Sequence, residues 1–197
     1  MNPSVPYHND HGLTVEVAIG HRVPLYYGRV STIKPLGVRR AAMSDREDHV
    51  IHQSPARFDE NRIRAAAVYC SDGRFGEHFD DFLHNSLKLP RYDRLAAPGG
   101  AACLAGRFLA FREEEGLAEQ LRFLIRTHRL ERVVLIAHEN CGFYTERLHV
   151  SPQNIETQQR EDMQTAIKRI GSFASGLVVE SFFARKHPDG TIRFESL

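Results

Sequence analysis

The sequence contains only three cysteines, no tryptophan and no long apolar run. Without about 18 consecutive apolar residues, no membrane-spanning helix is predicted. Lys and Arg together number 26 and Asp and Glu 25, which leaves a formal net charge of only +1. Because polyanion-binding proteins carry an excess of positive charge, we expect neither nucleic acid nor a membrane as a partner. The first residues lack the basic and then apolar pattern of a secretory signal, so we expect a cytoplasmic protein.

The three cysteines are Cys70, Cys103 and Cys141, an odd number spread widely along the chain. This spacing argues against a disulfide framework. Reduced thiols remain available as metal ligands or nucleophiles. Cys103 lies among small residues and is expected to be a packing thiol.

Residues 1–60 differ in character from the rest of the chain. Five of the nine prolines fall there and would break any long helix. Residues 13–17 alternate like an exposed strand, and residues 44–48 could open a short helix. We therefore expect an N-terminal arm or capping segment over residues 1–60, followed by one α/β domain over residues 61–197.

The pattern from residue 61 onward alternates between short apolar runs and amphipathic segments. Such alternation predicts an α/β fold, with a mostly parallel central sheet flanked by helices. A turn at residues 187–190 predicts an antiparallel edge strand. The expected strands cover residues 65–69, 133–137, 176–183 and 191–194, and the expected helices cover residues 76–87, 117–129 and 155–170.

Cysteine and histidine, two residue types that bind metals, lie directly at the ends of two of the expected strands. Cys70 ends the first run, and His138 and Cys141 follow the second. In open α/β sheets, ligands gather beyond the carboxyl ends of the strands, so these three side chains could meet. Two thiolates and one imidazole suit tetrahedral zinc, and three protein ligands leave a fourth position.

Asp72 decides whether that fourth position is open. If the extended backbone continues, Cys70, Asp72 and Arg74 share one face, and Asp72 could itself bind the metal. Alternatively, a bidentate ion pair with Arg74 would hold the carboxylate away and leave room for water. The pair therefore acts as a gate between a closed and an open metal site.

The motifs Cys-x-Asp-x-Arg and His-x-x-Cys-Gly together resemble those of the β-class carbonic anhydrases, over roughly residues 62–197. The resemblance implies that Cys70, His138 and Cys141 bind Zn²⁺ and that Asp72 and Arg74 form a catalytic dyad. It also implies a mainly parallel sheet and assembly as a homodimer or higher homo-oligomer. The implied reaction is the reversible hydration of carbon dioxide to bicarbonate, which would make the protein a zinc lyase with a small-molecule substrate.

The expected mechanism uses zinc-bound hydroxide as the nucleophile. Asp72 would accept a hydrogen bond from that hydroxide, and Arg74 would orient Asp72. Since two thiolates neutralise the charge of the metal, we expect activity to rise above neutral pH.

One stretch departs from the family pattern. The family commonly has Arg-Asn-Ala-Gly-Asn where this chain has Ala96-Ala97-Pro98-Gly99-Gly100. Alternative readings are the hydrolysis of a related heterocumulene such as carbonyl sulfide or carbon disulfide, a non-catalytic zinc-binding homologue closed by Asp72, and a thiol protein without metal. The glycines fail the spacing of phosphate-binding loops, so close backbone packing is expected there.

Overall fold

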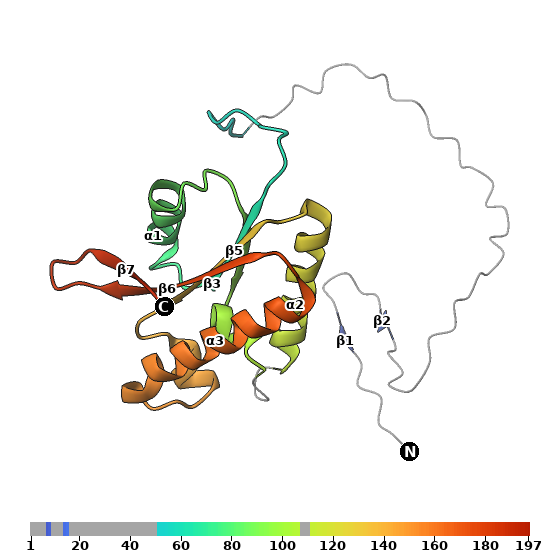
Figure 1. Ribbon diagram of the computed structural model, residues 1–197. Coiled ribbons are helices and arrows are strands. Elements are labelled where there is room, and N and C mark those ends of the chain that lie inside the picture. Colours follow the sequence, from blue (N-terminus) through green and yellow to red (C-terminus); the bar gives the residue numbers. More distant parts are fainter. Residues whose placement is uncertain (1–6, 9–13, 16–50, 107–110) are drawn as a thin grey trace, which may run out of the picture. The chain divides into compact units, whose positions relative to one another are not determined.

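The computed structural model describes residues 7–8, 14–15, 51–106 and 111–197 (Figure 1). The chain divides into a unit at Met1–Ala56 and a unit at Arg57–Leu197. In the first unit, strands β1 (Tyr7–His8) and β2 (Thr14–Val15) pair antiparallel. The strand expected at residues 13–17 overlaps β2, whereas the helix start expected at residues 44–48 lies outside the described residues. That residues 1–60 act as an arm stays a prediction.

The second unit is built on a five-stranded sheet with the order β4-β3-β5-β6-β7. Four strands run parallel, and β7 pairs antiparallel with β6. This confirms the predicted mostly parallel sheet with an antiparallel edge strand. The strands are β3 (Ala65–Cys70), β4 (Asp93–Ala97), β5 (Arg132–His138), β6 (Val178–Lys186) and β7 (Ile192–Ser196).

Strand β4 is not among the strands expected from the sequence. Its last residues, Ala96 and Ala97, pair with Tyr69 and Cys70 of β3. The strand was missed because it lies at the sheet edge, where Leu95 alone is fully buried and no continuous apolar run is needed.

Helices cover both faces of the sheet. The expected helix at residues 76–87 is split into an α-helix and a π-helical turn, and the one at 117–129 begins earlier. The helical elements are α1 (Gly76–Asp81), η1 (Phe82–Ser86), η2 (Gly100–Leu104), α2 (Phe111–His128), η4 (Phe143–Arg147), η5 (Pro152–Asn154) and α3 (Ile155–Phe173). Within the described part of the chain, no helix has the length and apolar character needed to cross a membrane.

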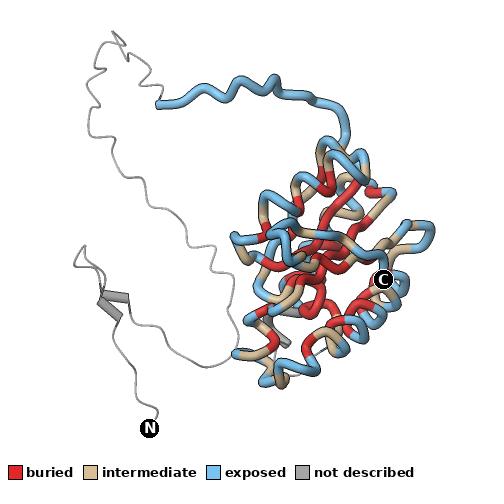
Figure 2. Tube along the Cα trace, turned by 90° about the vertical axis from the view of Figure 1, so that its left-hand side faces the viewer, coloured by how far each residue is buried: buried red, intermediate tan, exposed pale blue. Residues whose placement is uncertain are grey.

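The core lies on either side of the two central strands, which Figure 2 shows as buried. Successive residues of β3 point to opposite faces, as the pleat of a strand requires. Val68 belongs to one apolar cluster with Leu121 of α2 and Met163 of α3, whereas Ala67 belongs to a second cluster with Phe79 of α1. Both faces of β3 and β5 are therefore covered, which explains their continuous apolar sequences.

Candidate metal centre

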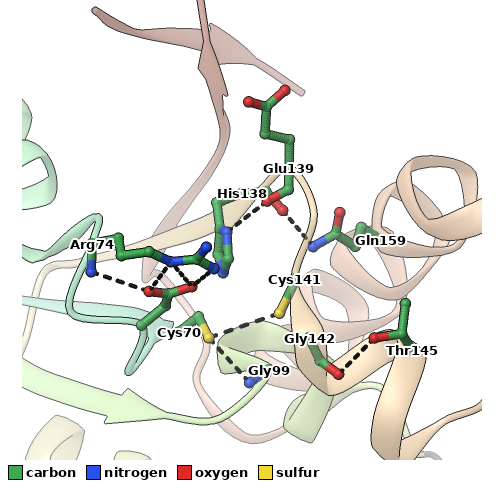
Figure 3. A network of polar contacts seen from close by, with 10 residues as sticks. Cys70, Arg74, Gly99, His138, Glu139, Cys141, Gly142, Thr145 and Gln159 are labelled. Atoms are coloured by element: carbon green, nitrogen blue, oxygen red, sulfur yellow. Dashed lines mark hydrogen bonds and ion pairs between the residues drawn. The ribbon is translucent and has the colours of Figure 1, made fainter. Parts of the chain in front are cut away.

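Strands β3 and β5 lie side by side and parallel, with Tyr69 opposite Ile136. Their carboxyl ends therefore meet at one edge of the sheet. Cys70 is the last residue of β3, His138 is the last residue of β5, and Cys141 follows three residues later. Their ligand atoms all lie within 4.8 Å of one another (Figure 3). The sheet thus brings together the three side chains that the sequence singled out.

The spacing of the donors fits a tetrahedral metal. The two Sγ atoms of Cys70 and Cys141 are 3.8 Å apart. A zinc ion about 2.3 Å from each of two sulfur atoms sets them roughly 3.8 Å apart in tetrahedral geometry. Two sulfur atoms and one imidazole nitrogen are a donor set that zinc favours.

His138 presents one ring nitrogen to this group. Its Nδ1 atom donates a hydrogen bond to the backbone carbonyl oxygen of Glu139 at 2.9 Å. Its Nε2 atom is buried and has no hydrogen-bond partner among the described residues. Because burying an unpaired polar atom is costly, a ligand for this nitrogen is expected. His138 fits a metal ligand that binds through Nε2.

The two cysteine thiols shift each other's pKa in opposite directions. The pKa of Cys70 is held below its ordinary value, chiefly by the hydrogen bond from the Cys141 thiol and further by His138 and the backbone N–H of Gly99. The pKa of Cys141 is raised, because its proton lies in the hydrogen bond to Cys70 and its surroundings are buried. The arrangement therefore favours ionisation of Cys70, and the thiolate is the form in which a cysteine binds a metal.

Two glycines bring the backbone close to the end of β3. Gly100 has a φ of +51°, and a Cβ atom there would lie 2.6 Å from the backbone carbon of Tyr69. Gly99 has a φ of +81°, and a Cβ atom there would lie 2.3 Å from the ring of Phe143. The expected close backbone packing is confirmed, and it lets the Gly99 N–H donate to the Cys70 sulfur at 3.4 Å.

Asp72 and Arg74 form the ion pair expected from the sequence. Arg74 donates to the Asp72 carboxylate from its backbone N–H at 3.1 Å, from Nε at 2.9 Å and from Nη2 at 2.5 Å. The guanidinium lowers the pKa of Asp72 to about 2. The Asp72 side chain is 17% exposed and that of Arg74 is 74% exposed, so solvent reaches the pair.

The extended backbone does not persist past Cys70, as one interpretation of the sequence assumed. The chain turns there, and the Phe75 N–H donates to the carbonyl oxygen of Asp72 at 3.0 Å. Asp72 accordingly faces Arg74 and does not join the converging donors. Among the described residues, the group that could hold a metal ion consists of three side chains.

Cys103 takes no part in this group. Its thiol donates to the carbonyl oxygen of Pro98 at 3.4 Å inside the main core. This is the packing position expected from the sequence.

Two contacts of His138 were not identified from the sequence. The Gln159 side chain of α3 donates from Nε2 to the backbone carbonyl oxygen of His138 at 2.9 Å. The Phe75 ring lies against the imidazole, with ring centroids 4.4 Å apart. A signal for Gln159 exists, because it stands four residues from Ile155 and from Met163 on the apolar stripe of its helix.

Residues 60–192 match the model of a family described as "Putative carbonic anhydrase". The chain belongs to this family. The kinship with carbonic anhydrases that the two strand-end motifs indicated is thereby confirmed. The Cys-x-Asp-x-Arg and His-x-x-Cys-Gly motifs both lie inside the matched range.

Three solved β-carbonic anhydrases are among the structures similar to this chain. The β-carbonic anhydrase isoform I of Trichomonas vaginalis is 13% identical, with 71% of this chain and 87% of that chain covered and a TM-score of 0.46. The β-carbonic anhydrase CafA of Aspergillus fumigatus is 16% identical, with 68% and 76% covered and a TM-score of 0.36. One of two tetrameric β-carbonic anhydrases of Sordaria macrospora is 13% identical, with 68% and 81% covered and a TM-score of 0.37. No curated protein matches the chain.

The stretch that departs from the β-class pattern lies directly beside the candidate metal centre. Ala96 and Ala97 end β4, and Gly99 contacts the Cys70 sulfur through its backbone. This stretch therefore offers Cys70 a backbone donor.

Proposed function

We propose that this protein is a zinc lyase that catalyses the reversible hydration of carbon dioxide to bicarbonate. The observation that supports this most is the convergence of Cys70, His138 and Cys141 without a fourth protein donor among the described residues. Zinc held there would lower the pKa of a water molecule, so that a hydroxide nucleophile exists near neutral pH.

Asp72 would orient the attacking oxygen. Its carboxylate stays ionised far below neutral pH, because Arg74 lowers its pKa to about 2. An ionised carboxylate only accepts hydrogen bonds. A water or hydroxide beside it must therefore point its hydrogen at Asp72, which turns an oxygen lone pair toward the carbon of carbon dioxide. Arg74 acts through Asp72 by fixing both carboxylate oxygens.

The surroundings suit a small neutral substrate. Cys141 and His138 are each only 1% exposed, and Phe75 covers the imidazole. Low local polarity strengthens the electrostatic interactions at the reacting atoms and excludes bulk water.

The pH dependence follows from the two sulfur ligands. Thiolates neutralise the charge of a divalent metal, so the water is acidified less than by an all-histidine site. We expect the hydration rate to rise above neutral pH. A flat rate profile between about pH 6 and pH 9 would contradict this expectation.

The test combines metal content with stopped-flow hydration of carbon dioxide between about pH 6.5 and pH 9, for the wild type and Asp72→Ala. We expect close to one zinc per chain and an activity that the substitution abolishes. Asp81→Ala serves as the control, because it removes an exposed carboxylate of α1 that bonds only Asn85 among the described residues. Zinc without hydration at any pH would leave a non-catalytic zinc-binding homologue.

A second candidate reaction is the hydrolysis of a related heterocumulene, carbonyl sulfide or carbon disulfide. The altered stretch beside Cys70 favours it, since Ala96 and Ala97 bring no polar side chain to position an oxygen-rich product. Both substrates should be assayed beside carbon dioxide on the same zinc-loaded preparation.

Family resemblance also leads us to propose a homodimer or higher homo-oligomer. A cytoplasmic location is a separate proposal, which the resemblance does not carry. Mass measured in solution tests the assembly. A monomer with full hydration activity would contradict it.

A further inference from the structure

Helix α3 reaches the metal-ligating loop through one buried side chain. Gln159 is 2% exposed, and its Nε2 atom donates to the backbone carbonyl oxygen of His138 at 2.9 Å. Figure 3 shows its amide beside the turn that carries His138 and Cys141. A polar side chain on the apolar stripe of a helix costs free energy unless its position is used.

The orientation of this amide is fixed by chemistry. Turning the amide over would place its oxygen against the oxygen of His138, which repels it. In the orientation that bonds, Oε1 is buried and has no partner among the described residues. The Gln159 amide therefore makes one hydrogen bond to the loop through Nε2, while its buried Oε1 atom has no partner among the described residues.

That hydrogen bond restrains the peptide between His138 and Glu139. Its carbonyl oxygen is held by Gln159, and its N–H donates to the carbonyl oxygen of Ala184 at 3.0 Å. A peptide unit is planar, so fixing both polar atoms fixes its plane. The Glu139 side chain is held too, since its Oε1 atom accepts from the Lys186 N–H at 2.8 Å.

The restraint passes on to the imidazole. The Glu139 carbonyl oxygen accepts the Nδ1 hydrogen of His138 at 2.9 Å. The direction of this carbonyl sets the tautomer and tilt of the ring, and so the direction of the Nε2 lone pair. A change in the 138–139 peptide would also move Cys141 within the same short turn.

We propose that Gln159 is a positioning residue for the metal centre, which fixes the loop so that His138 Nε2 and Cys141 Sγ meet the same cation. The proposal rests on the zinc site of the proposed function. It assigns to Gln159 a part of the metal affinity although Gln159 is not one of the candidate ligands.

The test compares Gln159→Met with Gln164→Met, an exposed glutamine of the same helix. Methionine keeps the length of the side chain and removes the donor. Zinc affinity is measured by competition with a chromophoric chelator, and the Co²⁺-substituted proteins are compared by absorption. We expect a zinc dissociation constant about 10–100-fold higher for Gln159→Met and an altered Co²⁺ spectrum, with Gln164→Met like the wild type.

Thermal unfolding separates positioning from a structural role. Positioning predicts that the stabilisation by zinc shrinks in Gln159→Met, whereas a packing role lowers both melting temperatures equally and leaves the affinity unchanged. In Gln159→Asn the side chain is too short for its amide to reach His138, so this variant should behave like Gln159→Met. It replaces Gln159→Met in the test if that variant does not fold. Equal affinity in wild type and both variants overturns this inference alone. A wild type that binds no zinc overturns the proposed function as well.

Discussion

The two strand ends that form the metal centre are built in opposite ways. After β3, Cys70 is followed by the charged pair Asp72 and Arg74, in which the arginine is 74% exposed. After β5, His138 and Cys141 are each 1% exposed and lie under helix α3. The end of β3 is open to solvent and carries a charged pair. The two candidate ligands at the end of β5 are buried, and a hydrogen bond from α3 holds their backbone.

This difference separates two tasks. The β5 end supplies two of the three metal donors, and its backbone is held by hydrogen bonds from α3 and to β6. The β3 end supplies one candidate donor and the carboxylate of Asp72, whose pKa Arg74 holds low. Metal affinity should therefore depend mostly on the β5 end, and turnover on the β3 end. Substitutions at each strand end test whether metal affinity and turnover are separated in this way.

The largest effect is expected from Cys141→Ser at the β5 end. Replacing a soft thiolate with a hydroxyl removes a strong zinc ligand, so we expect loss of stoichiometric zinc and a drop in hydration rate of roughly a thousandfold or more. Metal analysis and stopped-flow kinetics measure both. Cys103→Ser is the matched control, because a hydroxyl can also donate to the Pro98 carbonyl oxygen. Full zinc content in Cys141→Ser would refute the ligand assignment.

The next effect concerns Asp72→Asn at the β3 end. The amide has nearly the shape of the carboxylate but can donate as well as accept, so the orientation of the attacking oxygen is lost. We expect zinc content unchanged and a hydration rate roughly 100-fold lower. If zinc is lost together with activity, Asp72 is a fourth ligand and the site is closed.

A smaller effect is expected from Arg74→Gln. Without the guanidinium, the pKa of Asp72 should return from about 2 toward its ordinary 3.8. Asp72 still stays ionised at neutral pH, so only its orientation suffers, and we expect roughly a tenfold loss of rate with unchanged zinc. A loss as large as that of Asp72→Asn would give Arg74 a direct part in the reaction.

The smallest effect is expected from Glu156 of α3, whose ion pairs connect this helix to the sheet. Arg185 of β6, and then Arg160, lower the pKa of Glu156 through ion pairs at 2.8 and 2.9 Å. A lowered pKa in the folded state stabilises the fold above the unfolded pKa near 4.5, and this stabilisation fades as pH falls below it. We expect Glu156→Gln to melt about 1–3 °C lower at neutral pH.

Thermal unfolding of Glu156→Gln and wild type from neutral pH into the acid range checks the sign. The difference between the two proteins should vanish in acid. An equal difference at both ends of the range would mean that the charge of Glu156 contributes nothing.

The sequence was sufficient to predict the three candidate metal donors. It was not sufficient to predict the residues that hold those donors in place. Cys70, His138 and Cys141 could be placed together because parallel neighbouring strands must end at the same sheet edge. The Asp72 pairing with Arg74 was one of two open readings, since spacing alone does not say where a strand stops. The turn after Cys70 decided it.

The parts that escaped prediction depend on contacts distant in sequence. Strand β4 has one fully buried side chain, so its pairing with β3 leaves little trace in its own residues. Gln159 reaches a backbone atom 21 residues away, and only the packing of α3 on the sheet brings the two together. A periodic pattern reports which face of a helix is inside, but not what that face touches.

The two sulfur atoms are 71 residues apart in sequence, and β3 and β5 have to be paired before these atoms lie 3.8 Å apart. An unfolded chain therefore has no preformed place for a cation. We expect any metal to be bound only after β3 and β5 have paired. The fraction of molecules that carry metal would then report the fraction whose sheet is completely paired.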